Sequence, residues 1–107
     1  MSTSAANLEM QVLIDRLAPN EGLTTSALDG VRLFRSTRAH PRAPILYEPC
    51  IVLVCQGRKI GYLGEQVLPF DIDHFLLLTL PMPFESESIA SPEEPLLGVT
   101  VLESTGL

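Results

Sequence analysis

The feature that most constrains the fold of this chain is a succession of short apolar segments, each closed by turn-forming residues. The segments are rich in Val, Ile, Leu, Phe and Tyr and are separated by Gly, Pro, Asp and Ser, as the strands of an antiparallel sandwich or barrel are. They lie near residues 31–36, 45–55, 58–63, 66–70, 74–80, 84–89 and 96–103. The pattern predicts a mainly β chain with about seven strands.

A helix is expected ahead of the strands. Residues 8–18 repeat apolar side chains at helical spacing, Asn7 can cap the segment and Pro19 can end it. We therefore expect a short helix over about 7–18 and β structure over about 31–103. A chain of 107 residues can bury one core, so residues 1–107 are expected to form a single domain.

One hairpin can be predicted in register. Gly64 and Glu65 form a two-residue loop with glycine at its first central position, as a type II′ turn requires. The cross-strand pairs that follow are Leu63 with Gln66, Tyr62 with Val67, and Ile60 with Pro69. Because proline has no N–H to donate, the second strand is expected to lie at a sheet edge or to end at Pro69.

Both cysteines lie in one apolar run, at Cys50 and Cys55. Residues five apart in a strand point to opposite faces and lie roughly 16 Å apart, whereas a disulfide needs Cα atoms about 5.5–6 Å apart. We expect two small buried side chains. The alternative is a reactive Cys55, whose thiol pKa the charges of Arg58 and Lys59 would lower. The run is apolar at both parities, so both faces of this strand should be covered, one by the interior and the other by the helix or another subunit.

The charge distribution argues against nucleic acid as a partner. The net charge is −6, and residues 60–107 contain eight acids and no basic residue, while residues 1–59 contain seven basic residues and five acids. Phosphate recognition needs clustered Lys and Arg, so we expect no direct nucleic-acid binding. The first apolar segment contains charged residues, unlike a secretory signal, and no apolar run approaches the roughly 20 residues that span a bilayer. A cytoplasmic protein without membrane contact is expected.

Metal and cofactor sites are not expected. The only histidines, His40 and His74, lie in separate segments, so a three-histidine site cannot be assembled from one chain. His74 is interpreted as a boundary residue at the start of a strand. The basic cluster is either a solvated face or a site that recognises a carboxylate or another acidic surface, since guanidinium groups pair with carboxylates in two-point contacts. This cluster consists of Arg32, Arg35, Arg38 and Arg42, with His40 among them.

Catalysis is not expected either. Glu85 and Glu87 share one face of their strand and could divide acid and base roles. The simpler interpretation is an edge strand whose charges keep it soluble. The chain has no Gly-x-Ser-x-Gly elbow and no phosphate-binding glycine loop. We expect a protein that is not an enzyme.

Several strings resemble the N-terminal domain of AraC-type transcription regulators. The resemblance begins with LAPNEG at residues 17–22, VRLFRS at 31–36 and PILYEP at 44–49. It is most specific in QGRK at 56–59, YLGE at 62–65, HFL at 74–76 and SPEEP at 91–95. None of these motifs is catalytic.

The resemblance implies a cupin-like antiparallel β-barrel, that is, a double-stranded β-helix or jelly roll, with a short N-terminal helix. In the family this barrel senses a small effector or mediates dimerisation, and a C-terminal helix-turn-helix domain binds DNA. The sequence ends at Leu107 without such a domain and before the helices that form dimer contacts in the family. We therefore expect no DNA binding by this chain alone.

The expected function is that of an effector-sensing and dimerisation domain of an AraC-type regulator, forming a homodimer and binding a small molecule of unknown identity. Two alternatives stay open: a small metal-independent cupin enzyme that uses Cys55 or His74, and a module that only dimerises. Side chains with a polar tip or an aromatic body set among apolar strands are the candidate ligand contacts, although packing alone would also explain Tyr62 and Phe84. The candidates are Tyr47, Cys55, Arg58, Tyr62, His74 and Phe84.

Overall fold

The computed structural model describes residues 5–79 and 82–102, although the side chains of residues 7, 46, 47, 82 and 83 lie outside the described part. Within it, one helix precedes nine strands. The elements are α1 (Ala5–Leu17), β1 (Gly22–Thr25), β2 (Val31–Ser36), β3 (His40–Tyr47), β4 (Cys50–Gln56), β5 (Arg58–Leu63), β6 (Gln66–Phe70), β7 (Leu76–Leu78), β8 (Met82–Ile89) and β9 (Leu96–Leu102). The expectation of a mainly β chain with a short N-terminal helix is confirmed.

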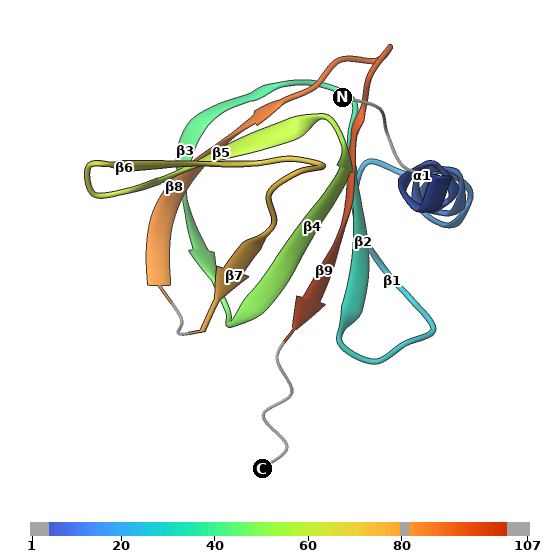
Figure 1. Ribbon diagram of the computed structural model, residues 1–107, viewed down its shortest axis with the longest axis horizontal. Coiled ribbons are helices and arrows are strands. Elements are labelled where there is room, and N and C mark those ends of the chain that lie inside the picture. The colour runs from blue at the N-terminus through green and yellow to red at the C-terminus, as the bar shows by residue number, and fades with distance from the viewer. Residues whose placement is uncertain (1–4, 80–81, 103–107) are drawn as a thin grey trace.

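The strands form two antiparallel sheets that face each other around a shared interior, with α1 on the outside (Figure 1). The five-stranded sheet has the order β1-β2-β9-β4-β7, and the four-stranded sheet has the order β3-β8-β5-β6. The chain passes from one sheet to the other at Gly57, between β4 and β5. Gly57 has φ 76°, a conformation that residues with a Cβ rarely adopt. The QGRK string is therefore one of the corners at which the chain passes between the two sheets.

The predicted hairpin is confirmed in every pair. Leu63 pairs with Gln66, Tyr62 with Val67, and Ile60 with Pro69. Gly64 has φ 60°, as the first central position of a type II′ turn requires. β6, which contains Pro69, is an edge strand of its sheet, so the missing N–H of Pro69 interrupts no ladder on that side.

The prediction of one strand over 45–55 is wrong. Residues 48 and 49 separate β3 from β4, and the two strands belong to different sheets. Pro49 cannot donate a ladder hydrogen bond and biases Glu48 away from helical geometry, which suits a passage between sheets. Apolarity alone did not reveal this break, because residues on both sides of it point into the same interior.

The structure differs from the predicted strands in three further respects. β1, a short segment with little apolar content, was not predicted. β7 is shorter than the predicted 74–80 because Asp71 and His74 close a turn through two mutual backbone hydrogen bonds, of 2.9 and 3.2 Å, just before it. β8 is also not an edge strand, since β3 and β5 pair with it on either side. The edge on that side of the sheet is β3.

The interior between the sheets holds the main apolar cluster. Residues of alternate parity on β4 point into it, and they meet side chains from the opposite sheet. The buried members are Cys50, Val52, Val54, Phe70, Leu76, Leu78, Phe84 and Leu96.

A second apolar cluster lies on the outer face of the five-stranded sheet, under α1. Ile14 and Ala18, with exposed fractions of 1% and 0%, pack there against four buried sheet residues. These are Leu33, Cys55, Leu97 and Val99. The Arg35 guanidinium fastens the end of the helix: its Nε–H donates to the Ala18 carbonyl at 2.9 Å, and it forms an ion pair with Asp15.

The helix covers only one end of this outer face. Beyond it lies a set of apolar side chains that we call the outer apolar face, which consists of Ile51, Leu53, Phe75, Leu77 and Val101. Phe75 is 62% exposed and Leu77 is 55% exposed. The expected cover of the second face of β4 is thus present at Cys55 but incomplete at Leu53. In the described part of the chain, no helix has the length and apolar character needed to cross a bilayer.

Candidate functional site

A cavity of about 670 Å³ lies between the two sheets. Its walls are largely apolar, because inward-facing residues of both sheets line it. They include Phe34, Ala43, Ile45, Cys50, Val52 and Leu96. Pockets for small organic molecules have this size and this kind of wall.

Polar side chains gather at one end of the cavity. His40 on β3 pairs with Ser88 on β8, and Ser88 pairs with Lys59 on β5. The three residues therefore form a row across three neighbouring strands, about 5 Å from one strand to the next, and all three line the cavity. We call this set the polar row. Ser86 lies on the same interior face, two residues before Ser88.

A hydrogen bond links the polar row to the opposite sheet. His40 Nε2 lies 3.0 Å from Ser36 Oγ on β2. The Ser36 hydroxyl donates its one proton to the Arg38 carbonyl at 2.8 Å, so His40 Nε2–H is the donor to Ser36. The two sheets are thereby joined where the cavity is most polar.

Charged side chains line the cavity in both signs. Arg32, Arg38 and Lys59 are cationic, and Glu21 and Glu48 are acidic. The Glu21 carboxylate accepts hydrogen bonds from the Thr37 backbone N–H at 3.0 Å and from the Thr37 hydroxyl at 3.0 Å. The backbone hydrogen bond is the main reason why the pKa of Glu21 is lowered. The Glu21 carboxylate is therefore occupied by these hydrogen bonds, which stabilise the connection between β2 and β3.

A smaller hollow of about 330 Å³ lies between α1 and residues 71–75. Cys55 and His74 both line it. Burial raises the pKa of the Cys55 thiol to about 11, which is opposite to the lowering that a reactive Cys55 would need. His74 Nδ1 lies 3.1 Å from Asp71 Oδ1. The pKa of Asp71 is lowered, chiefly by the hydrogen bond from the Asp73 backbone N–H.

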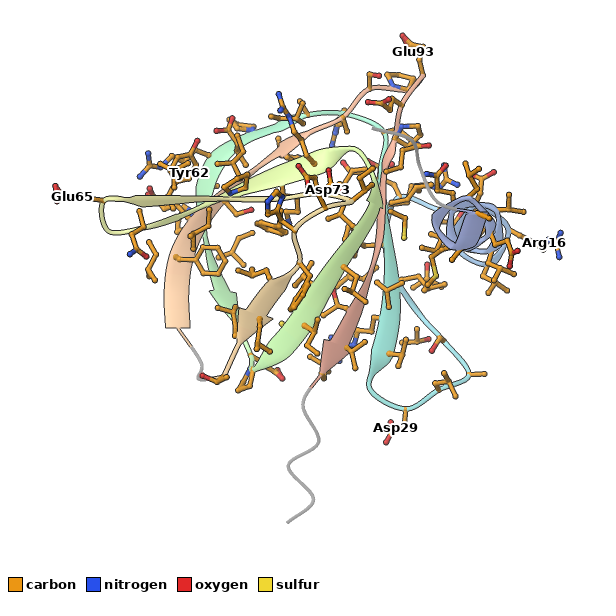
Figure 2. All side chains as sticks on the ribbon, viewed as in Figure 1. Arg16, Asp29, Tyr62, Glu65, Asp73 and Glu93 are labelled. Carbon is orange, nitrogen blue, oxygen red and sulfur yellow. The ribbon has the colours of Figure 1, made fainter. Side chains whose placement is uncertain are left out.

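Tyr62 and Arg58 lie on the outer face of the four-stranded sheet, since their parity on β5 is opposite to that of Lys59. Figure 2 shows Tyr62 projecting away from the interior. Its hydroxyl donates to Glu87, and this hydrogen bond is the main reason why the pKa of Tyr62 is raised. The Arg42 guanidinium lies 3.9 Å from the centroid of the Tyr62 ring and pairs with Glu85.

The six candidate residues from the sequence are not brought together. Phe84 is buried between the sheets, Tyr62 and Arg58 are on the outside, and Cys55 and His74 line the smaller hollow. The side chain of Tyr47 lies outside the described residues. A ligand contact by any of these side chains stays a prediction.

The polar row was not among the predicted site residues. A signal for it exists in the sequence: the serines and acids of β8 alternate, so one set must face inward if the other faces outward. The prediction for this strand concerned Glu85 and Glu87 and did not include Ser86 and Ser88. The basic cluster is divided by the fold, because Arg32, Arg38 and His40 line the cavity while Arg42 lies on the outer face.

Among residues 5–79 and 82–102, no group of three or more His, Cys, Asp or Glu side chains lies close enough together to hold a metal ion.

Comparison with known proteins identifies the family. A family model described as the AraC-type transcriptional regulator N-terminus matches residues 27–102, which include every strand from β2 to β9. No curated protein and no solved structure matches the chain. The match covers more than half of the 107 residues, and the chain therefore belongs to the family of AraC-type transcriptional regulator N-termini.

Proposed function

We propose that this chain is the effector-sensing and dimerisation part of an AraC-type transcriptional regulator. The observation that carries the proposal is the cavity of about 670 Å³ between the sheets, with apolar walls and a polar row at one end. Family membership supports a regulatory rather than a metabolic role. The finer fold that we propose is the cupin-like jelly roll of the family, to which two facing antiparallel sheets correspond.

The proposed mechanism is a population shift. An effector that binds one arrangement of the two sheets better than another favours that arrangement, by an amount equal to its difference in affinity. The His40–Ser36 contact joins the two sheets at the cavity, so a ligand that competes for these groups would act on both sheets at once.

Dimerisation is proposed on a separate observation. The outer apolar face consists of five apolar side chains, and Phe75 and Leu77 among them are more than half exposed. Exposed apolar patches of this kind mark interaction surfaces. A second copy of the chain would bury it. The chain itself is proposed to make no DNA contact, because its net charge of −6 opposes association with phosphates.

The alternative of a metal-independent enzyme has less support. A cysteine nucleophile requires a thiolate, and therefore a lowered pKa, whereas burial raises the pKa of Cys55 to about 11. His74 is exposed and is paired with Asp71. Binding explains the described groups without an activated nucleophile.

A ligand screen on matched variants tests effector sensing. Ser86→Leu fills the cavity from β8, and Glu87→Gln changes the neighbouring residue on the outer face. A ligand present at about 100 times its Kd stabilises a fold by about 2.7 kcal/mol, which raises the Tm of a domain of this size by more than about 10 °C. We expect small-molecule hits that raise the Tm of the wild type and of Glu87→Gln but not that of Ser86→Leu.

A diverse library without any cavity-dependent hit would contradict effector sensing and favour the module that only dimerises. Circular dichroism of Ser86→Leu establishes that the variant is folded before its response is interpreted. If Ser86→Leu does not fold, Ala43→Leu fills the same region from the neighbouring strand β3.

A further inference from the structure

We propose that the cavity between the sheets binds a small carboxylate with an apolar body, and that its carboxylate group lies at the polar row. The inference rests on the proposed function, because it assigns the chemical class of the effector. Four features of the cavity lead to it: its hydroxyls, its cations, the placement of its acids and its apolar walls.

The hydroxyls of the cavity are open to a ligand. Ser86 and Ser88 are 4% and 8% exposed and line the cavity. Within the described chain, neither hydroxyl makes a side-chain hydrogen bond. Every fully buried side-chain N or O atom there has a hydrogen-bond partner, so these two hydroxyl oxygens are not fully buried. Both hydroxyls are therefore accessible from the cavity. A carboxylate oxygen would accept a hydrogen bond from each.

Cations stand on both sides of these hydroxyls. Lys59 neighbours Ser88 in register and enters the interior with its Nζ 5.9 Å from the centroid of the Phe70 ring. Arg38 lines the cavity at the turn before His40. Hydrogen bonds between a charged donor and a carboxylate are about twice as strong as neutral ones, and the apolar surroundings reduce screening by water.

Of the two acids of the cavity, Glu21 lies at this end, beside Arg38, and Glu48 does not. Thr37 already holds the Glu21 carboxylate. Glu48 follows the last residue of β3, whereas His40 is the first residue of that strand, so the two lie at opposite ends of the cavity. An incoming anion at the polar row therefore meets Lys59 and Arg38, while the Glu21 carboxylate at this end is occupied by Thr37 and its charge is opposed by that of Arg38.

The rest of the cavity suits an apolar body. The row next to the polar row contains Ala43, Ser86 and Gly61, and the row after it contains Ile45 and Phe84. Side chains on β4 and β9 form the opposite wall, among them Val52 and Leu96. An aliphatic or aromatic chain attached to the carboxylate would contact these walls and lose its apolar surface from water.

Calorimetric titration of the 107-residue chain with three probes that differ only in the head group tests the inference. The probes are phenylbutyrate, phenylbutanol and phenylbutylamine. We expect phenylbutyrate to bind at least about tenfold more tightly than phenylbutanol, because a charged hydrogen bond at the polar row is lost with the alcohol. Phenylbutylamine should bind most weakly, since Lys59 and Arg38 repel it.

Neighbouring residues of β5 supply the matched variants. Lys59→Met should weaken phenylbutyrate binding at least about tenfold and leave phenylbutanol unchanged, whereas Arg58→Met, on the outer face, should change neither. If Lys59→Met does not fold, Arg38→Met and Ser88→Ala should each weaken the carboxylate selectively.

Equal affinity for the acid and the alcohol, or no binding of the acid, would overturn the assignment of a carboxylate. Effector sensing would still stand if uncharged library compounds stabilise the wild type and lose their effect in Ser86→Leu. The two proposals thus fail in different experiments.

Discussion

Gly98 is the residue at which a single added carbon atom would have the largest effect on the core. A Cβ at Gly98 would lie 2.2 Å from Phe34 Cζ and 2.3 Å from the Leu53 carbonyl oxygen. Phe34 is the cross-strand partner of Gly98 on β2, so its ring lies over the bare backbone of β9. The ring could rotate away, but the carbonyl belongs to β4 and cannot move without shifting the sheet.

We predict that Gly98→Ala lowers the free energy of unfolding by about 2–4 kcal/mol, the range of overpacked cores or somewhat beyond it. Urea denaturation monitored by circular dichroism measures the change. Gly61→Ala is the matched control, because its nearest contact is the end of the Phe84 ring at 2.9 Å, and a side chain can adjust more easily than a backbone. Equal stability of Gly98→Ala and the wild type would contradict the prediction.

The faces of β4 on which the two cysteines lie could be predicted only in part from the sequence. Their position on opposite faces of one strand is confirmed, since Cys50 faces the interior and Cys55 faces α1. Which face is which could not be predicted, because the run is apolar at both parities. The strand also carries a β-bulge at one end: Val54 and Gln56 pair with adjacent residues of β9, so Cys55 is the extra residue. The thiol that reaches the cavity is Cys50.

At the element scale, α1 is attached through a narrow stripe. Ile14 and Ala18 are buried, while Leu8, Val12, Leu13 and Leu17 are about half exposed or more. The apolar pattern predicted the helix, but it did not identify the buried side, because apolar residues extend around most of its circumference.

We predict that Ile14→Ala lowers the free energy of unfolding by about 2–4 kcal/mol through the cavity left under the helix. Leu13→Ala, a neighbour that is 47% exposed, should cost less than about 1 kcal/mol. Denaturant titration measures both variants. If α1 undocks on its own, the loss will instead appear as faster amide exchange confined to Ala5–Leu17. Similar behaviour of the two variants in both measurements would show that α1 is not held by this stripe.

The hairpin and the segment 45–55 differ in predictability for a physical reason. A two-residue loop with glycine determines its own register, since turn geometry and strand pairing are both local. The break between β3 and β4 is not local. It exists because the chain must leave one sheet and enter the other. The partner strands that decide this, β8 and β9, begin at Met82 and Leu96, far beyond Pro49 in the sequence.

At the scale of the whole molecule, the outer apolar face leads to a prediction about assembly. We predict a reversible dimer in sedimentation velocity experiments at several concentrations. Leu77→Glu should weaken it at least about tenfold, because a carboxylate buried without a partner is costly. Val67→Glu is the control: Val67 is 59% exposed, close to the 55% of Leu77, but it belongs to β6 of the other sheet. A chain that is monomeric at every concentration, or equal weakening by both substitutions, would contradict dimerisation through this face.

The family resemblance rests on short strings of residues that the sequence contains. The sequence also predicted the β class, the N-terminal helix, the hairpin register and the opposite facing of the cysteines. These follow from periodicity, glycine conformation and spacing, which act over a few residues. Only the tertiary structure decided that Ser36, His40, Lys59 and Ser88 surround one end of a cavity, and that Tyr62 and Arg58 point away from it. That arrangement depends on which strands become neighbours and which face each strand turns to the interior. Because the 50–55 run is apolar at both parities, local pattern does not determine its inner face, and packing against the rest of the chain does.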